Sequence, residues 1–438
     1  MADKFVIEGG RIPKGAIEVM GAKNSSLGIL SAALLTEKPC VIDNLPLIED
    51  VLKMIKTIES LGAEIEWLDK RKIKITSKDI NPENLPNEII GRFRGSILTL
   101  GPLLARFKKV KTIPPGGCLI GARPIDTHLD AFSQAGVSIS SDKKFYFLEE
   151  TPDFKSFYQN PFIIDKKDLK DKAKEIILKE FSVTATENIL LYSSLKDRKT
   201  IIRIADSDYE IQELSSVLEQ MGAEIKGTGT HTIKIKGRKK LKGFTHKIMP
   251  DPIETGTFIV LALASGGEIK IDNAQLSFLE LFLKRIRDFG AKFEVLSPNS
   301  IKVFSSKKLK MDKVQSLPYP GIQTDLQPEL GVLATQSQGP TLIHDPLYEG
   351  RLKYLEELNK MGADIIFCDP HRAIINGPTP LFGVEIPSPD LRAGAALVIA
   401  GVIASDITVI ENVYQIDRGY ERLEERLSLL GIDIKRIK

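Results

Sequence analysis

The chain of 438 residues has 42% hydrophobic and 27% charged residues, a composition typical of a globular protein with one or two substantial cores. Its 61 basic and 58 acidic residues leave a net charge of +3 and are spread along the whole sequence, which argues against a nucleic-acid or membrane partner. No basic and apolar leader opens the chain, and the longest apolar run, 394–404, is too short to cross a bilayer. We therefore expect a cytoplasmic protein.

The cysteines and histidines give no support for a metal, a cofactor or a disulfide framework. Cys40, Cys118 and Cys368 lie far apart without CxxC spacing, and the five histidines are scattered without HExxH spacing. The sequence also lacks a P-loop and a GxGxxG turn. We expect free thiols, no metal and no cofactor.

In chain order, six segments share one pattern, which marks an internal repeat. A helical pattern leads to a glycine that fits a helix C-cap, and an alternating strand pattern follows. The six glycines are Gly62, Gly136, Gly222, Gly290, Gly362 and Gly431. Their spacing is mostly about 70 residues, too long for a solenoid repeat, so each repeat is predicted to be a small α/β unit.

Earlier in the repeats we predict a second helix rich in small apolar residues, as at 25–35 and 255–264. The longest interval between glycines contains a charged stretch, 153–174, which we interpret as a surface insertion. Six units group most simply as three plus three. This grouping predicts two α/β domains with a ligand cleft between them.

Lys23 and Asn24, in the segment GAKNSS, stand just before a predicted apolar helix. Free backbone N–H groups and the helix dipole favour a phosphate or carboxylate at such a position. The alternative is a helix N-cap with a solvated lysine.

The Pro/Gly-rich segment 114–117 precedes Cys118, and Arg123 follows five residues later. Such a segment suits a lid that brings a reactive group over a substrate. A thiol near arginines has a lowered pKa and can serve as a proton donor or a nucleophile. An inert loop cysteine is the alternative.

Four further arginines, Arg94, Arg351, Arg392 and Arg418, are candidates for binding a small anion with several charges, because the guanidinium fork matches phosphate and carboxylate. Individually such residues are more often salt-bridged on the surface. Asp325 lies in a Pro/Gly-rich loop before a predicted helix. Among arginines its carboxylate would stay ionised and accept a proton, although an N-cap would explain it as well.

Taken together, these segments resemble the UDP-N-acetylglucosamine enolpyruvyl transferases. The matching segments run in the family's order over nearly the whole chain: GAKNSS, RGSILTLGPLLARF, PGGCLIGARP, IETGTF, PYPGIQTDLQP, YEGR, DLRAGAALV and IDRGYER. The related enolpyruvylshikimate phosphate synthases share the six-unit architecture but lack the PGGC segment. Cys118 therefore favours the nucleotide-sugar branch.

The resemblance implies a two-domain inside-out α/β barrel built from six βαβαββ-type units, three per domain, with the N-terminal strand returning to the C-terminal domain. One domain would span 22–247 and carry the Cys118 loop, and the other would join 1–21 to 248–438. The implied reaction moves the enolpyruvyl group of phosphoenolpyruvate to the 3-hydroxyl of UDP-N-acetylglucosamine and releases phosphate, in peptidoglycan precursor synthesis. Both partners are small molecules, and no metal is implied.

The resemblance also implies roles for individual residues. Cys118 would be the proton donor, able to form an adduct with the pyruvyl carbon and open to alkylation by fosfomycin, while Asp325 would be the base near the attacking hydroxyl. Lys23 and Arg418 join these two as catalytic groups. The phosphoenolpyruvate set is Lys23, Asn24, Arg123, Arg392 and Arg418. The UDP-sugar set is Asn24, Arg94, Arg123, Pro124, Ile125, Asp126, Thr127, Ser182, Val183, Thr184, Asp325 and Leu347.

Four departures from the family pattern concern the nucleotide sugar and the hinge rather than phosphoenolpyruvate. Thr184 replaces a usual glycine, 204–214 replaces an Arg-Glu-Pro-Glu-Ile pattern, Pro252 replaces a common arginine, and Gln415 replaces a common histidine. They leave open a transferase for another nucleotide sugar. Two further hypotheses are a catalytically silent UDP-sugar-binding paralogue and an RNA terminal phosphate cyclase, and the sequence offers no catalytic histidine site for the latter.

Overall fold

The computed structural model describes residues 3–117, 120–121, 124–151 and 173–438. The predicted insertion 153–174 lies outside this part of the chain except for its last two residues. Contacts divide the chain into two compact units: unit 1 comprises Met1–Gly21, Cys118–Ala122 and Pro250–Lys438, and unit 2 comprises Ala22–Gly117 and Arg123–Met249. The sequence-based domains differ from these units in two respects. The boundary predicted after residue 247 lies after Met249. Ile120 belongs to unit 1, where its carbonyl accepts the Gly350 N–H at 2.8 Å.

Unit 2 is built from helices and strands that alternate along the chain. Its helices are α1 (Lys23–Ala32), α2 (Glu49–Ser60), α3 (Asn87–Ile90), α4 (Leu100–Phe107), α5 (Asp126–Ala135), α7 (Val183–Ser194) and α8 (Tyr209–Gln220), with 3-10 turns η1 (Ala33–Leu35), η2 (Pro82–Asn84) and η3 (Arg94–Thr99). Its strands are β3 (Cys40–Asp43), β4 (Glu64–Asp69), β5 (Lys72–Thr76), β6 (Lys109–Thr112), β7 (Val137–Ser141), β8 (Tyr146–Glu150), β9 (Lys174–Ile177), β10 (Lys199–Arg203), β11 (Glu224–Lys226), β12 (Thr232–Lys236) and β13 (Thr245–Lys247).

Unit 1 repeats the same plan. Its helices are α9 (Pro252–Ser265), α10 (Glu280–Asp288), α11 (Gln327–Thr335), α12 (Tyr354–Lys360), α13 (Leu391–Ile403), α14 (Tyr414–Asp417) and α15 (Leu423–Ser428), with η4 (Leu276–Phe278), η5 (Thr324–Leu326) and η6 (Arg351–Lys353). Its strands are β1 (Lys4–Glu8), β2 (Lys14–Glu18), β14 (Glu268–Asp272), β15 (Lys292–Ser297), β16 (Ser300–Phe304), β17 (Lys313–Gln315), β18 (Gly339–His344), β19 (Asp364–Asp369), β20 (Arg372–Gly377), β21 (Glu385–Pro387), β22 (Ile407–Glu411) and β23 (Asp433–Ile437).

One sheet pattern recurs in both units. Each four-stranded sheet has a parallel pair followed by two antiparallel neighbours, as in the order β17-β18-β20-β19, while β6-β8-β7 forms a three-stranded sheet. The N-terminal strand β1 lies between β22 and β23, with Val6 opposite Val409 and Lys435. The N-terminal strand therefore completes the last repeat, and the predicted inside-out α/β architecture is confirmed.

Two equivalent strands are exchanged between the repeats. In a repeat that stays within one unit, the strand before the inner helix pairs with the strand after it, as β9 does with β10 around α7. By contrast, β2 precedes α1 of unit 2 but pairs with β14 of unit 1, and β13 precedes α9 of unit 1 but pairs with β3 of unit 2. At each of these two points the chain leaves one strand in the sheet of the first unit before it enters the inner helix of the second unit.

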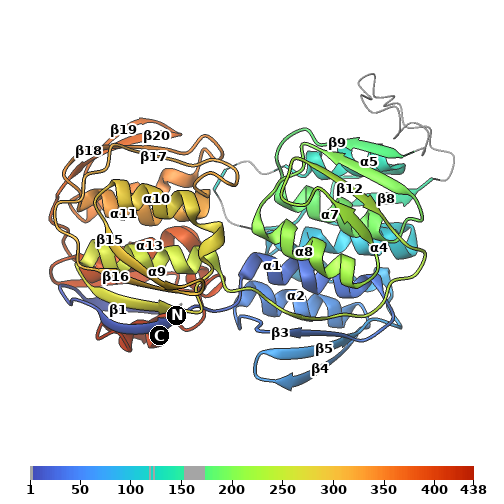
Figure 1. The fold of residues 1–438 in the computed structure, drawn as a ribbon, viewed down its shortest axis with the longest axis horizontal. Helices are drawn as coiled ribbons and strands as arrows, with labels where there is room; N and C mark the ends of the chain where they lie inside the picture. The colour runs from blue at the N-terminus through green and yellow to red at the C-terminus, as the bar shows by residue number, and fades with distance from the viewer. Residues whose placement is uncertain (1–2, 118–119, 122–123, 152–172) are drawn as a thin grey trace. The chain divides into compact units, whose positions relative to one another are not determined.

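The helices lie inside each unit and the strands lie outside (Figure 1). In unit 1, α9, α11 and α13 pack against one another, and in unit 2, α4 and α7 pack together while α1 packs on α8. Every residue of α13 from Leu391 to Val402 is buried, so this helix is buried on all sides rather than amphipathic. The predicted helices at 25–35 and 255–264 correspond to α1 with η1 and to α9.

The six repeat glycines end helices as predicted. All six have positive φ, between 85° and 112°, the left-handed region in which a Cβ atom is strained. At the last of the three in unit 2, the Gly222 N–H donates to the Glu219 carbonyl and the next N–H donates to the Leu218 carbonyl. This hydrogen-bond pattern satisfies carbonyl groups at the helix end.

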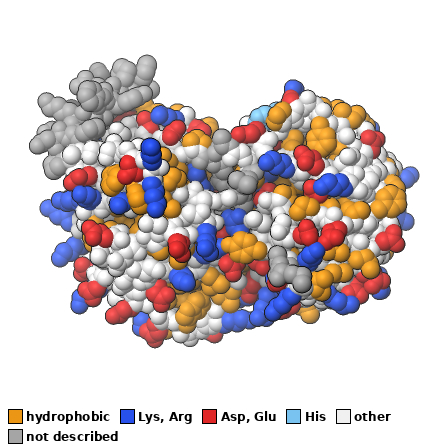
Figure 2. All heavy atoms as spheres, turned by 180° about the vertical axis from the view of Figure 1, so that it is seen from behind, with side chains coloured by type: hydrophobic (Ala, Val, Ile, Leu, Met, Phe, Trp, Pro, Cys, Tyr) orange, Lys and Arg blue, Asp and Glu red, His pale blue; other side chains and the backbone are white. Residues whose placement is uncertain are grey.

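The surface matches the balanced charge of the sequence. On the face shown in Figure 2, basic and acidic side chains are interspersed with apolar ones over both units. Within the described residues, no helix combines the length and the apolar character that crossing a membrane requires.

Substitutions at two of the repeat glycines can distinguish the cost of backbone strain from the cost of steric overlap. A Cβ at Gly222 would meet no atom within 4 Å, whereas one at Gly62 would overlap the Asp79 carbonyl oxygen. We expect Gly222→Ala to lower the free energy of unfolding by about 1 kcal/mol from backbone strain alone. Gly62→Ala should cost roughly 1 kcal/mol or more beyond that. Urea unfolding of both variants checks the order, and equal losses would contradict it.

Candidate functional site

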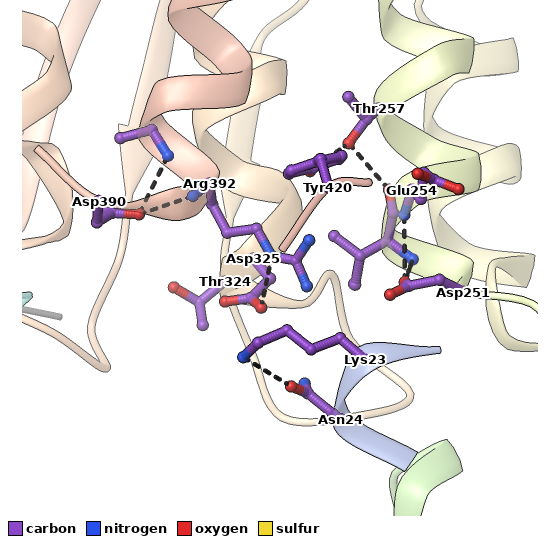
Figure 3. A network of polar contacts seen from close by, with 12 residues as sticks. Lys23, Asn24, Asp251, Glu254, Thr257, Thr324, Asp325, Asp390, Arg392 and Tyr420 are labelled. Carbon is purple, nitrogen blue, oxygen red and sulfur yellow. Dashed lines mark hydrogen bonds and ion pairs between the residues drawn. The ribbon is translucent and has the colours of Figure 1, made fainter. Parts of the chain in front are cut away.

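The carboxylate of Asp325 is held by two buried arginines in unit 1. Asp325 lies in η5, at the start of α11, and its side chain is 28% exposed. Arg351 Nη2 donates to Oδ1 at 2.9 Å. Arg392 Nε donates to Oδ2 at 3.0 Å (Figure 3). Because the two side chains are only 3% and 1% exposed, the surface salt bridge considered for them is wrong. Asp325 does not act as a helix N-cap.

Asp390 fixes the helix that carries Arg392. It is the N-cap of α13, and its Oδ1 accepts the N–H groups of Arg392 at 2.9 Å and Ala393 at 3.1 Å, which satisfies donors that an N-terminus leaves unpaired. The same oxygen lies 3.6 Å from Arg351 Nη1. One carboxylate therefore orients both arginines that hold Asp325.

A hydrogen-bonded chain extends from Arg351 to Leu347. Arg351 Nε donates to Thr324 Oγ1 at 3.0 Å, and Thr324 Oγ1 donates to Asp345 Oδ2 at 2.5 Å. Asp345 Oδ1 accepts the N–H groups of Leu347 at 3.0 Å and Tyr348 at 3.1 Å. The loop that presents the predicted UDP-sugar residue Leu347 is thus tied to the Asp325 cluster.

A buried polar group one helical turn beyond Asp325 was not predicted from the sequence. Glu329 on α11 is fully buried, and burial raises its pKa to about 7. Its Oε1 accepts from the Thr257 hydroxyl at 3.0 Å and from the Tyr420 hydroxyl at 3.2 Å, and these two hydroxyls are 2.8 Å apart. The Arg392 guanidinium carbon lies 5.4 Å from the Tyr420 ring centroid, so this network borders Arg392. The polar Thr257 in the apolar helix 255–264 was the available signal.

Arg418, another predicted phosphoenolpyruvate residue, lies at the end of α14 and is buried. Its Nη1 donates to Gln415 Oε1 at 3.0 Å. The glutamine at the common histidine position therefore contributes to the position of Arg418. Pro252 also has a local explanation, since it occupies the first turn of α9, where proline is favoured.

Lys23 and Asn24 lie in the first turn of α1 rather than before it, because the helix begins at Lys23 with Ala22 as its N-cap. The Lys23 side chain is 12% exposed, and its Nζ lies 3.2 Å from Asp50 Oδ2 and 3.4 Å from Asn24 Oδ1. Asn24 Nδ2 donates to Glu210 Oε1 at 2.9 Å. Neither residue caps the helix with its side chain, so the alternative of an N-cap with a solvated lysine is wrong.

The segment 204–214, which departs from the family pattern, contains acidic residues, and one of them, Glu210, accepts the hydrogen bond from Asn24. Asp206, Asp208 and Glu210 are buried beside Glu187. Burial, with the charges of neighbouring carboxylates added, raises the pKa of Glu187 and Glu210 well above the ordinary value. Neutral carboxyl groups at this position can be buried at less cost than charged ones.

Most of the predicted nucleotide residues of unit 2 lie at the starts of α5 and α7, two helices that pack together. Arg94 Nη2 donates to the Pro124 carbonyl at 2.9 Å, just before α5. Thr127 on α5 donates to Glu180 at 2.8 Å, and Ser182 caps α7 by accepting the Ala185 N–H at 3.3 Å. Among the remaining members, Ile125 is the N-cap residue of α5, Asp126 is its first residue, and Val183 and Thr184 are the first two residues of α7. Cys118 and Arg123 lie outside the described residues.

Comparisons with known proteins agree with this architecture. A family model described as EPSP synthase (3-phosphoshikimate 1-carboxyvinyltransferase) matches residues 7–427. A UDP-N-acetylglucosamine 1-carboxyvinyltransferase of Treponema denticola is 38% identical over 440 residues, covering 99% of both chains. Another, numbered 1, of Carboxydothermus hydrogenoformans is 39% identical over 435 residues, covering 99% of this chain and 98% of the relative.

Solved structures show the same fold at lower identity. The enolpyruvyl transferase NikO from Streptomyces tendae matches with a TM-score of 0.84 and 23% identity, covering 100% of this chain and 99% of that one. An EPSP synthase from Acinetobacter baumannii matches with a TM-score of 0.75 and 17% identity over the whole of both chains. The family match over residues 7–427 and the fold shared with the solved structures therefore agree with each other.

Replacing Glu329 by glutamine should change how stability depends on pH. Between pH 4.5 and about 7 the folded protein keeps the Glu329 proton that the unfolded chain releases. The contribution of Glu329 to the free energy of unfolding therefore decreases as the pH rises through this range. The unfolding free energy of the wild type minus that of Glu329→Gln should fall by about 3 kcal/mol over this range and then level off. Urea unfolding at several pH values checks this, and a pH-independent difference would exclude the buried titration.

Proposed function

Because the chain belongs to the EPSP synthase family of enolpyruvyl transferases, we propose that it transfers the enolpyruvyl group of phosphoenolpyruvate to the 3-hydroxyl of UDP-N-acetylglucosamine and releases phosphate. The observation that carries this proposal is the identity of 38% to 39% over nearly the whole chain with relatives named for that reaction. The reaction opens peptidoglycan precursor synthesis. A cytoplasmic location, expected from the sequence, is part of the same proposal.

Asp325 is the proposed base of the transfer. The sugar 3-hydroxyl adds to C2 of phosphoenolpyruvate, and a base that takes its proton makes the oxygen a better nucleophile. Supporting this role, the Asp325 carboxylate is partly open to solvent while two buried arginines hold both of its oxygens. Such pairing favours the ionised form, which is the form that can accept a proton.

The cationic side chains are proposed to bind phosphoenolpyruvate and to stabilise charge that develops in the transfer. Lys23, Arg392 and Arg418 are all largely buried and fixed by neighbours. Preorganised cations aimed at developing charge are commonly the largest catalytic contribution. Asn24 belongs to the same set through its contact with Lys23, and Arg123 is assigned to it from the sequence.

Cys118 is the proposed proton donor to C3 of phosphoenolpyruvate. Addition of the sugar oxygen to C2 and of the proton to C3 gives a tetrahedral ketal. Phosphate then leaves from C2 and a proton leaves from C3, so that the enolpyruvyl double bond forms again. This role rests on the sequence, where Cys118 lies in the PGGC segment five residues before Arg123. An arginine nearby lowers the pKa of a thiol, which makes the thiol a stronger acid. The thiolate formed when it loses its proton is the form that an epoxide such as fosfomycin alkylates.

The nucleotide sugar is assigned one group of residues in each unit. The unit 2 group consists of Asn24, Arg94, 124–127 and 182–184, the last two ranges at the starts of α5 and α7. Arg123 is assigned to this group from the sequence. Asp325 and Leu347 form the unit 1 group, linked by hydrogen bonds through Thr324 and Asp345.

Phosphate release is the direct test of this function. The purified protein with phosphoenolpyruvate should release phosphate only when UDP-N-acetylglucosamine is added, because the acceptor hydroxyl is needed to form the ketal. Preincubation with fosfomycin should abolish the release through alkylation of Cys118. A folded protein that releases no phosphate would redirect the assignment to another acceptor sugar or to a silent paralogue.

Asp325→Asn tests the proposed base. The amide keeps the size of the side chain but cannot accept the proton, so we expect kcat to fall about 10²- to 10⁴-fold. Asp390→Asn is the matched control, because Asp390 also pairs with Arg351 while asparagine caps a helix as well as aspartate. Steady-state kinetics of both variants, after a check of folding, decides the matter. Equal losses in the two variants would reduce Asp325 to a partner of the arginines.

A further inference from the structure

His128 forms a hydrogen-bonded bridge in unit 2 that the transfer chemistry above does not use. It lies on α5 and is 2% exposed. Its Nδ1 is 3.1 Å from Asn188 Nδ2, and its Nε2 is 3.1 Å from Thr184 Oγ1. Both partners lie on α7, and Thr184 stands where the enolpyruvyl transferases usually have glycine.

The direction of each hydrogen bond follows from one backbone donor. The Gly101 N–H can only donate, and it lies 2.8 Å from Asn188 Oδ1. The amide nitrogen of Asn188 therefore points the other way and donates to the Ile97 carbonyl at 3.0 Å and to His128 Nδ1. His128 Nδ1 accepts a hydrogen bond and so carries no proton.

His128 is neutral, which places its single ring proton on Nε2. Burial, and to a lesser degree the charge of Arg94, lower the pKa of His128 to about 3. The Nε2–H group therefore donates to Thr184 Oγ1. Since the threonine oxygen is already an acceptor on this side, the Thr184 hydroxyl proton must point away from His128.

No other partner for the Thr184 hydroxyl is found within the described residues. Thr184 lies in the first turn of α7, is only partly buried, and belongs to the proposed UDP-sugar set. A hydroxyl held in this way presents a donor to whatever binds beside it. A glycine at position 184 could not make this contact.

We propose that His128 is a positioning residue that turns the Thr184 hydroxyl so that its proton is donated to an oxygen of the UDP moiety. The proposal rests on the proposed function, because it takes the nucleotide site of α7 from it. Asn188 sets the tautomer of His128, His128 sets the rotation of Thr184, and Thr184 contacts the substrate. The contact between the nucleotide and Thr184 therefore depends on Asn188 and His128 as well.

Binding of UDP, measured by calorimetry, tests the contact itself. Thr184→Val replaces the hydroxyl by a methyl group of similar size, and we expect UDP affinity to fall about 10-fold, the effect of one lost hydrogen bond. Thr184→Ser keeps the hydroxyl and should stay within about 3-fold of the wild type. The KM for UDP-N-acetylglucosamine should rise with Thr184→Val in the same proportion, while kcat and the KM for phosphoenolpyruvate stay unchanged.

Two substitutions of His128 test its positioning role. The amide of His128→Gln can still accept from Asn188 and donate to Thr184, so UDP affinity should be retained, whereas His128→Leu should weaken it about as much as Thr184→Val. The double variant His128→Leu/Thr184→Val should bind UDP no more weakly than Thr184→Val alone, because the two substitutions remove the same contact between Thr184 and UDP. A merely structural role would give additive losses and no rescue by glutamine.

The outcomes separate this proposal from the proposed function. Wild-type protein that binds UDP but releases no phosphate with UDP-N-acetylglucosamine would refute the function and leave the binding comparison decisive. UDP affinity within about twofold of wild type in Thr184→Val, or no UDP binding by the wild type, would overturn the hydroxyl contact. If His128→Leu does not fold, the comparison of valine with serine at position 184 still decides it.

Discussion

Two almost fully buried guanidinium groups meet one carboxylate in unit 1, and the surrounding structure follows from the need to balance those charges. A buried charge without a partner is strongly destabilising, so Arg351 and Arg392 each need an anionic oxygen, and Asp325 supplies one to each. Asp390 adds a second carboxylate that also fixes the start of α13. The proposed reactive group and its support are therefore one set of contacts, and the geometry of Asp325 is set before any substrate binds.

The cost of burying a charge also acts on other buried acidic groups in each unit. Glu329 lies one turn from Asp325, and burial outweighs the attraction of Arg392, so its pKa rises instead of falling. In unit 2, Glu187 and Glu210 are likewise buried close to further carboxylates. Each inner helix bundle thus contains carboxyl groups whose pKa is raised by burial, and in its protonated form such a group can donate or accept hydrogen bonds without adding charge.

Much of this arrangement could be predicted from the sequence, and the rest depends on packing. The six helix-ending glycines could be predicted because a positive φ has a local cause. The inner helices could be predicted from their small apolar residues. The partners of Asp325, the Glu329 network and the bridge through His128 could not, because they join side chains far apart in the sequence, most of them from different repeats, that meet only after the helices pack. The start of α1 was misplaced by two residues, since Ala22 offers no capping side chain as a signal.

The exchanged and returning strands fix an order in which the protein can be completed during synthesis. Apart from residues 118–122, unit 2 runs without interruption from Ala22 to Met249, so it can close while later residues are still being made. The strands β1 and β2 leave the ribosome earlier, but their partners β14, β22 and β23 come after residue 267. These ten strand residues must remain unpaired through the translation of the whole of unit 2. Charged residues at the ends of both strands limit pairing with other chains during this interval.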